Sequence, residues 1–117
     1  MSIDLKRAYD EPEAGDGLRI LVDRLWPRGV SKEQLQLDKW IKEVAPSDEL
    51  RKWFNHDSEK FEEFKERYRQ ELEKNPKPVS RLAEMAEEHD ITLVYGAKDR
   101  EHNQALVLKE YLEKKYN

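Results

Sequence analysis

The stretch Leu18–Gly29, Leu-Arg-Ile-Leu-Val-Asp-Arg-Leu-Trp-Pro-Arg-Gly, decides the fold that this chain can adopt. Residues 18–24 predict a strand, because the apolar run from Ile20 to Val22 is typical of a strand covered on both faces of a sheet. The proline that follows fixes its own φ and keeps the preceding tryptophan out of the helical region, so the strand ends there. A buried strand that ends in a rigid, arginine-bearing turn therefore lies at the centre of the predicted fold.

Two further strands are expected around this element. Residues 91–95 form a second continuous apolar run, which favours a central, parallel neighbour, and residues 3–9 alternate as an edge strand does. Residues 36–44 fit either a helix or a short strand, and we favour a strand or an irregular segment. Residues 10–17 are mostly acids and turn formers, and they predict an exposed loop.

The helices are marked by capping residues and by apolar residues at helical spacing. Ser31 and Gln34 predict a capping box. Ser47 precedes another helix, and Asp99 is a natural N-cap for the last one. Aromatic side chains predict core packing rather than base stacking; they are Trp40, Trp53, Phe54, Phe61, Phe64 and Tyr68. The predicted fold class is α/β, with a small, mainly parallel sheet of three to four strands, about five flanking helices and a single domain over residues 1–117.

The composition excludes several classes of protein. The chain contains no cysteine, which excludes disulfides, cysteine nucleophiles and thiolate metal sites. The net charge of −4 opposes non-specific binding to nucleic acid, so a nucleic-acid partner is not expected. No apolar run approaches the roughly 20 residues of a membrane helix, and the N-terminus lacks the apolar segment of a signal peptide. We therefore expect a cytoplasmic protein without a membrane partner.

The sequence pattern indicates neither a metal nor a cofactor. His56 and His102 lack the paired spacing that metal-binding histidines usually have. No glycine-rich loop of the kind that holds a nucleotide cofactor follows the first strand. We therefore expect no metal and no cofactor in the site.

The turn after the buried strand at residues 18–24 carries two arginines, Arg24 and Arg28, on either side of Trp26. Ligands of α/β proteins bind beyond the carboxyl ends of the strands, where two arginines can hold a phosphate or a carboxylate by paired hydrogen bonds. In the alternative interpretation, Asp23 or another acidic residue, Asp99, pairs with one arginine and locks the turn, and the tryptophan is a core residue.

Residues 96–103 form a second polar turn, again between a buried strand and a helix. The N–H groups of a helix N-terminus favour an anion, and Lys98 and Asn103 add further donors. His102 has the chemistry of a general acid or base near neutral pH. In the alternative interpretation, Asp99 is a plain N-cap and the histidine faces solvent.

Together the two turns predict a site, because parallel neighbouring strands would bring both turns to one edge of the sheet. The candidate ligand-binding residues are Arg24, Trp26, Arg28, Lys98, Asp99 and Asn103, and the candidate catalytic residue is His102. The predicted function is binding of a small phosphate- or carboxylate-bearing ligand, with or without a catalytic step. The alternative is a non-catalytic module that binds protein or nucleic acid and uses its arginines structurally.

Motifs of unusual sequence are spread over the chain. They are Val22-Asp-Arg-Leu-Trp-Pro-Arg-Gly29, Ala45-Pro-Ser47, Leu50-Arg-Lys-Trp-Phe54, Phe64-x-x-x-Tyr68, Ala97-Lys-Asp99 and His102-Asn103. Together they resemble the DUF488 family, in its short YeaO-like branch, over about residues 3 to 113. The resemblance implies a small cytoplasmic α/β protein of bacteria or archaea, with the candidate site residues at signature positions. A related branch carries cysteines near the same turns, and this chain has none, so no thiol chemistry is carried over.

Overall fold

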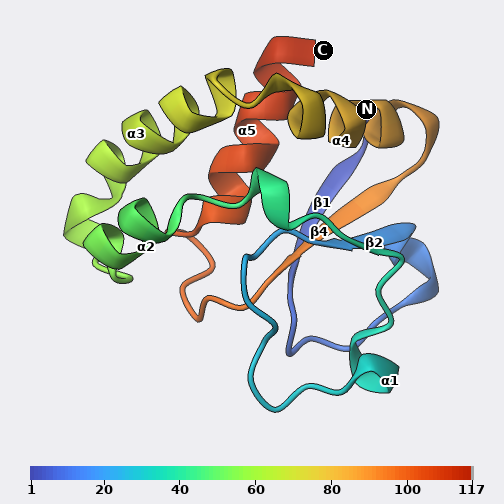
Figure 1. The fold of residues 1–117 in the computed structure, drawn as a ribbon. Helices are drawn as coiled ribbons and strands as arrows, with labels where there is room; N and C mark the ends of the chain where they lie inside the picture. The colour runs from blue at the N-terminus through green and yellow to red at the C-terminus, as the bar shows by residue number, and fades with distance from the viewer. Residues whose placement is uncertain (117) are drawn as a thin grey trace.

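The computed structural model describes residues 1–116 and shows an α/β fold (Figure 1). Within these residues the strands are β1 (Ile3–Arg7), β2 (Leu18–Leu21), β3 (Lys39–Trp40) and β4 (Ile91–Tyr95). The α-helices are α1 (Lys32–Leu35), α2 (Asp48–Phe54), α3 (Phe61–Glu73), α4 (Pro76–Glu88) and α5 (Gln104–Tyr116). All strand pairs are parallel, in the order β1-β4-β2-β3, which confirms the predicted fold class.

The two apolar strands β2 and β4 are neighbours at the centre of the sheet. Ile20 is opposite Leu93 and Leu21 is opposite Val94, and all four side chains are fully buried. β2 ends earlier than predicted, although the N–H of Val22 still donates to the carbonyl of Val94 at 3.1 Å. Since the strands run in parallel, the turns that follow β2 and β4 leave the sheet at the same edge.

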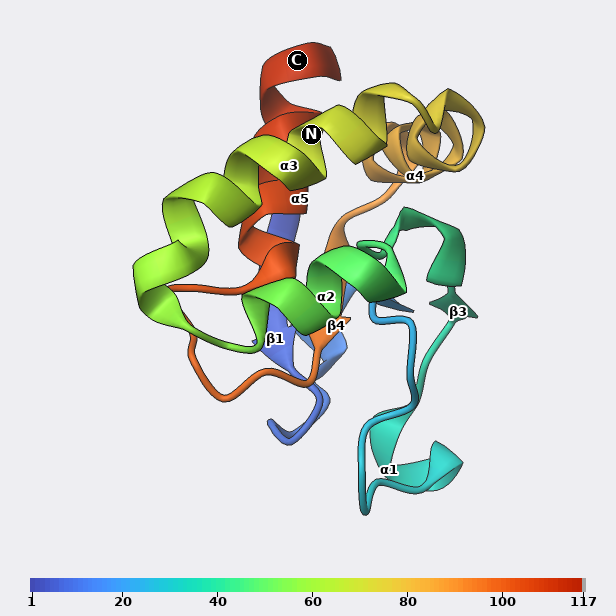
Figure 2. The same cartoon turned by 60° about the vertical axis from the view of Figure 1, so that its left-hand side comes forward.

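Alternate residues of the central strands enter two cores of unequal size. Ile20 and Leu93 join the large core beneath α2, α3, α4 and α5, where Phe54 and Phe64 stack with ring centroids 4.3 Å apart. Leu21 and Val94 point to the other face and pack with α1 in a much smaller core. Figure 2 shows α1 standing apart from the other helices, on a long connection between β2 and β3.

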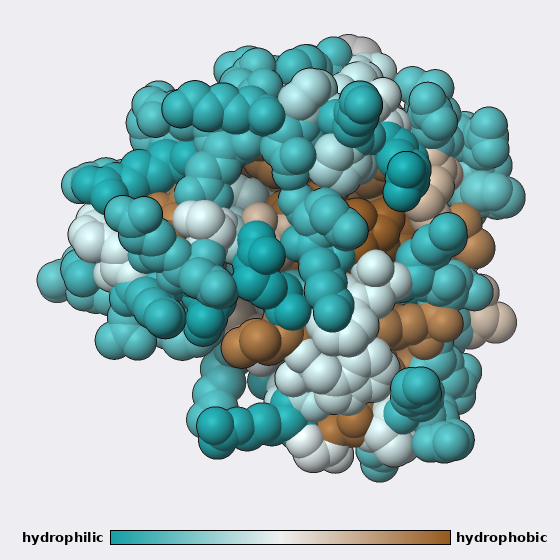
Figure 3. Space-filling view, viewed as in Figure 1, coloured by the Kyte–Doolittle hydropathy of each residue, from teal (hydrophilic) through white to brown (hydrophobic). Residues whose placement is uncertain are grey.

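The aromatic side chains of α2 and α3 lie in the large core, as the helical spacing predicted. Four of these side chains, Phe54, Phe61, Phe64 and Tyr68, are buried, and Tyr68 donates its hydroxyl to the carbonyl of Val44. The outer faces of the helices carry the charge, and the view in Figure 3 is mostly hydrophilic, with hydrophobic side chains visible only in separate patches.

Two of the predicted caps are confirmed. The Oγ of Ser31 accepts the N–H of Gln34 at 3.1 Å, and the Oε1 of Gln34 accepts the N–H of Ser31 at 2.8 Å. Ser47 caps α2 by accepting the N–H of Leu50 at 3.1 Å. The segment left open between helix and strand contains β3, followed by a short 3-10 helix at Lys42–Val44, so the preference for a strand is confirmed.

The prediction that Asp99 caps the last helix is wrong. Helix α5 begins at Gln104, and the Oδ1 of Asn103 accepts the N–H of Leu106 at 2.9 Å, which is the bond of an N-cap. Asp99 instead accepts two backbone N–H groups in a separate turn over residues 99–102. Both residue types form caps, and the sequence alone did not distinguish which turn each would close.

The prediction of an exposed loop over residues 10–17 is wrong for Asp16. This residue is only 9% exposed and lies in a 3-10 helix, Ala14–Asp16. Its carboxylate accepts hydrogen bonds from Lys6 at 3.0 Å and from Arg19 at 2.6 Å. The loop is therefore anchored to the sheet by a buried ion-pair network.

Candidate functional site

The turns after β2 and β4 enclose a cleft of about 590 Å³ at the carboxyl edge of the sheet. The first turn contributes Asp23, Leu25, Trp26, Pro27 and Arg28, and the second contributes Gly96, Ala97, Lys98 and Asp99. Tyr9 and His56 complete the lining. The volume lies within the range of roughly 300–1,000 Å³ that is usual for small-molecule sites.

The structure brings four of the predicted site residues together in this cleft and leaves three outside it. Trp26, Arg28, Lys98 and Asp99 line the cleft, whereas Arg24, His102 and Asn103 do not. The division follows from the backbone: the turn after β4 is longer than expected, because α5 begins only at Gln104.

Arg28 and Lys98 are the cleft's two cations. Both side chains are exposed, and neither lies within 4.0 Å of a carboxylate of the residues that the structure describes. The hydroxyl of Tyr9 donates to the backbone carbonyl of Arg28 at 3.0 Å, which holds the turn without occupying the guanidinium. The two positive charges thus face the cleft from different turns with no internal acidic partner.

Arg24 has the internal contacts that the alternative interpretation described, although with a different partner. Its Nη2 donates to the carbonyl of Pro46 at 3.2 Å, and its Nε lies 3.7 Å from a carboxylate oxygen of Asp48. Neither Asp23 nor Asp99 forms an ion pair with an arginine among residues 1–116. Arg24 therefore fastens the turn to the start of α2.

Trp26 forms a fixed wall of the cleft. Its Nε1 donates to the carbonyl of Val30 at 2.6 Å, and its ring meets the ring of Trp40 edge to face, with centroids 5.4 Å apart. The Nε1 of Trp40 in turn donates to the backbone carbonyl of Asp23 at 2.7 Å. These hydrogen bonds connect β3 to the turn after β2, so the position of the Trp26 ring is fixed by the sheet.

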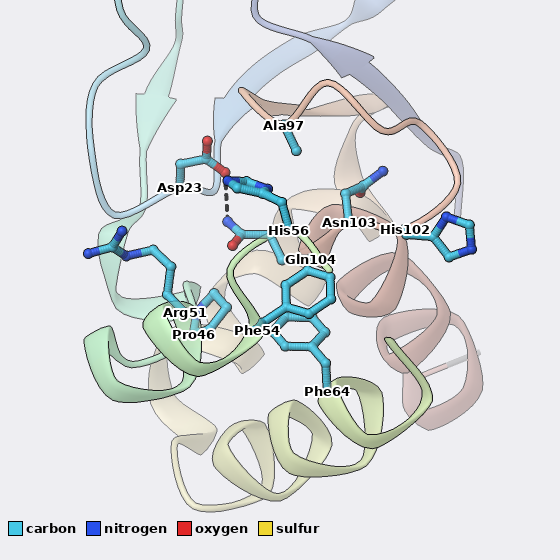
Figure 4. Close-up of a pocket in the computed structure, with 10 residues that line it drawn as sticks. All are labelled: Asp23, Pro46, Arg51, Phe54, His56, Phe64, Ala97, His102, Asn103 and Gln104. Atoms are coloured by element: carbon cyan, nitrogen blue, oxygen red, sulfur yellow. Dashed lines mark hydrogen bonds between the residues drawn. The ribbon is translucent and has the colours of Figure 1, made fainter. Parts of the chain in front are cut away.

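Residues 99–103 form a turn that is held by hydrogen bonds among these residues. The carboxylate of Asp99 lies 2.8 Å from Nδ1 of His102, and the histidine ring packs edge-on against Phe61 at 5.1 Å. The backbone N–H of Glu101 and then the histidine side chain hold the pKa of Asp99 below its usual value. Asn103 is buried and donates to the carbonyl of Asp99 at 3.0 Å. His102 thus has a fixed place in the turn, and Figure 4 shows its ring at the periphery, away from Asp23.

Asp23 is a functional candidate that the sequence reasoning treated only as a salt-bridge partner. Its Oδ2 accepts the backbone N–H of Gly96 at 2.8 Å, and its Oδ1 accepts from Nε2 of Gln104 at 2.6 Å. Burial raises the pKa of this carboxyl to about 6, against the opposing effect of the Gly96 N–H. An acid placed directly after a buried strand was the signal for it, since strand ends carry the sites of α/β folds.

A second, smaller cavity has a volume of about 70 Å³, and Figure 4 shows the residues that line it. Asp23, His56 and Ala97 line both cavities, so the two spaces share a wall. Arg51 lines only the smaller one, and its Nε is buried with no hydrogen-bond partner in the described chain. We name this smaller space the inner chamber. It could not be predicted from the sequence, because α2 reaches the edge of the sheet only in the folded chain.

The local backbone explains how His56 reaches the cavities. Asn55 and His56 both have left-handed backbone angles, with φ of 46° and 57°, which end α2 and turn the chain back towards the sheet. His56 and Asp23 both line the two cavities. The sequence reasoning identified this segment as a helix break but gave the histidine no role.

Two searches for other kinds of site found nothing within residues 1–116. No group of three or more His, Cys, Asp or Glu side chains in this part of the chain is arranged to hold a metal ion. No helix there has the length and apolar character required to cross a membrane.

Comparison with known proteins places the chain in a family. A family model described as "Inactive DUF488-N3 subclade" matches residues 2–117. The uncharacterised protein YeaO of Escherichia coli is 48% identical over 112 residues, which cover 96% of this chain and 97% of the relative. The uncharacterised protein Rv3073c of Mycobacterium tuberculosis is 36% identical over 110 residues, covering 94% and 92%. No solved structure matches. The chain therefore belongs to the DUF488 family, within the subclade described as inactive.

Proposed function

We propose that this protein binds a small phosphate- or carboxylate-bearing ligand in the cleft, without converting it chemically. One observation carries the proposal: Arg28 and Lys98 reach a single cleft of ligand size from two different turns and have no acidic partner within the described residues. An anion bound between them would receive charge-assisted hydrogen bonds, which are stronger than neutral ones. A cytoplasmic location belongs to the same proposal.

The two acidic side chains of the cleft are held by other partners and form no ion pair with Arg28 or Lys98 within the described residues. Asp99 is engaged by His102 and by backbone N–H groups, and Asp23 accepts hydrogen bonds on both oxygens. The chain as a whole carries a net charge of −4, so attraction for an anion must come from a local pair of cations such as this one.

Binding without catalysis is supported by the family description and by the position of the histidine. The matched subclade is described as inactive. His102, the predicted proton carrier, lines the inner chamber but not the cleft, and its Nδ1 is held by Asp99. General acid–base catalysis needs the side chain within hydrogen-bond reach of the reacting group, which the fixed turn does not favour.

Titration of the full chain with inorganic phosphate and with acetate, followed by amide NMR signals, tests the proposal. We expect shifts confined to residues 24–30 and 96–99, and a loss of about tenfold in phosphate affinity in Arg28→Ala. Stability should change by less than about 0.5 kcal/mol, because Arg28 has no internal ion pair. Arg81→Ala, at an exposed position on α4 away from the cleft, is the matched control and should keep the wild-type affinity. Unmoved amide signals in both turns would rule out the proposal.

A further inference from the structure

The inner chamber extends the cleft by a space for one small polar group. Its volume of about 70 Å³ is much smaller than the 590 Å³ of the cleft. Asp23, His56 and Ala97 line both spaces, so a ligand in the cleft lies next to the chamber. Whatever enters the chamber must therefore be small and must satisfy the polar atoms that line it.

Asp23 presents acceptors to the chamber. A carboxylate has about four lone-pair sites, and the protein occupies one on each oxygen, through Gly96 and Gln104. The same two bonds fix the carboxyl group at the end of β2, so its remaining acceptor sites have a defined direction. A group that donates a hydrogen bond is the natural partner for them.

Arg51 contributes a hydrogen-bond donor that lacks an acceptor within the described chain. Its Nε is buried and donates to no atom of the described chain, although its Nη2 lies 3.4 Å from a carboxylate oxygen of Asp48. A buried donor without an acceptor destabilises the protein, so an acceptor supplied by a ligand would be favourable here. The residues that line the chamber thus include a carboxylate with free acceptor sites and an arginine with a donor that is unpartnered among residues 1–116.

A hydroxyl group can pair with both Asp23 and Arg51, because it donates one hydrogen bond and accepts two. A phosphate or a carboxylate in the chamber would lie against the charge of Asp23, and an ammonium group has no acceptor for Arg51. Phe54 and Phe64 supply apolar walls that suit the C–H groups of a carbon skeleton. These properties together describe a polyhydroxylated carbon chain.

We propose that the ligand is a phosphorylated or carboxylated sugar, with its anionic group at Arg28 and Lys98 and its hydroxyl groups at Asp23 and Arg51. This inference rests on the proposed function, because the anion must first occupy the cleft. It adds the inner chamber as the part of the site that selects one anion over another. His56 lies where the two spaces meet and contacts the middle of such a ligand.

Calorimetric titration of the full chain with two phosphate monoesters tests the selection. Ribose 5-phosphate carries hydroxyl groups, and propyl phosphate carries the same anionic group on a bare carbon chain. We expect ribose 5-phosphate to bind at least tenfold more tightly. Equal affinity for the two esters would overturn the inference and leave the proposed function intact, whereas absence of binding by both would overturn the two together.

Arg51→Met provides the second test, since methionine keeps much of the length of the side chain and removes the buried donor. Affinity for ribose 5-phosphate should fall about tenfold while affinity for propyl phosphate stays unchanged. The melting temperature should stay the same or rise, because a buried donor without a partner has been removed. We prefer this variant to Asp23→Asn, which also disturbs the bonds to Gly96 and Gln104.

Lys52→Met is the matched control for that variant. Lys52 is the next residue of α2, is exposed, and lines neither the cleft nor the chamber. It should leave both affinities at their wild-type values. If Arg51→Met lowered both affinities equally, or lowered the melting temperature without changing their ratio, the residue would be structural and the inference would be overturned.

Discussion

Strand β2 is flanked by two aspartates with opposite surroundings. Asp16, two residues before the strand, is buried beside Lys6 and Arg19, with shortest N–O distances of 3.0 and 2.6 Å. Asp23, two residues after it, is partly buried, has no cation within 4.0 Å in the described chain and borders both cavities. The charge of the neighbours, more than burial, separates a carboxylate that serves the fold from one that is available to a ligand.

The pKa values of the two carboxyl groups move in opposite directions. Burial alone would raise the pKa of Asp16, but the backbone N–H of Glu13 and the cations of Lys6 and Arg19 outweigh it and hold the pKa below its usual value. For Asp23 burial dominates, and the pKa rises from 3.8 to about 6 because only the Gly96 N–H opposes it. The same residue type therefore has a lowered pKa at one end of β2 and a raised pKa at the other.

The largest expected effect is the loss of the Asp16 network. Arg19→Met removes the guanidinium that donates to Asp16 at 2.6 Å and to the carbonyl of Leu35 at 2.9 Å, both in a buried setting. The free energy of unfolding in urea should fall by about 3 kcal/mol, because one buried charge loses its main partner. Arg100→Met breaks an exposed pair with Asp10 and should cost less than about 1 kcal/mol. Equal losses in the two variants would remove the distinction between the two aspartates.

The next effect is the pH dependence of Asp23. Its folded pKa exceeds the unfolded value of 3.8, so the native state holds the proton more tightly and this group's contribution to stability falls as the pH rises from about 4 to about 6. A shift of about 2 units corresponds to about 3 kcal/mol at full ionisation. The stability of Asp23→Asn relative to the wild type should therefore increase by up to that amount between pH 4 and pH 7, measured by urea unfolding at each pH. A difference that is constant with pH would mean that Asp23 is not desolvated.

The smallest effect sharpens the comparison between the two arginines of the turn. Arg24→Ala should lower the free energy of unfolding by about 1 kcal/mol, because the side chain is partly exposed and its bonds to Pro46 and Asp48 are long, at 3.2 and 3.7 Å. Phosphate affinity should stay unchanged, since Arg24 does not line the cleft. A loss of phosphate binding at unchanged stability would instead show that Arg24 binds the ligand.

The central sheet could be predicted because its information is local. The run Ile20–Val22 is apolar and residues 91–95 are apolar except for Thr92, and such runs favour strands inside a covered, parallel sheet. The caps at Ser31 and Ser47 were equally visible, since a cap and the N–H group that it accepts are three residues apart. The shared edge of the two turns followed from the same pairing of β2 with β4.

The rest of the site depends on contacts between distant parts of the chain. Asp23 meets Gln104 across 81 positions. Arg51 of α2 lines the inner chamber, and His56, just after α2, lines both cavities. The local sequence pattern does not specify these long-range contacts, because they depend on how the helices pack on the sheet. The burial of Asp16 was missed for the same reason: its partner Arg19 appears in sequence to be an ordinary strand residue.

The edge-to-face pair of Trp26 and Trp40 has a consequence for spectroscopy. Indole rings held in a fixed, asymmetric setting give near-ultraviolet circular dichroism, and this pair combines a ring of the cleft wall with a ring bonded to Asp23. The third tryptophan, Trp53, lies on α2 against Arg67 and borders a different surface. The chain therefore carries an intrinsic optical reporter beside its cleft, and the state of that cleft is readable in the unlabelled protein.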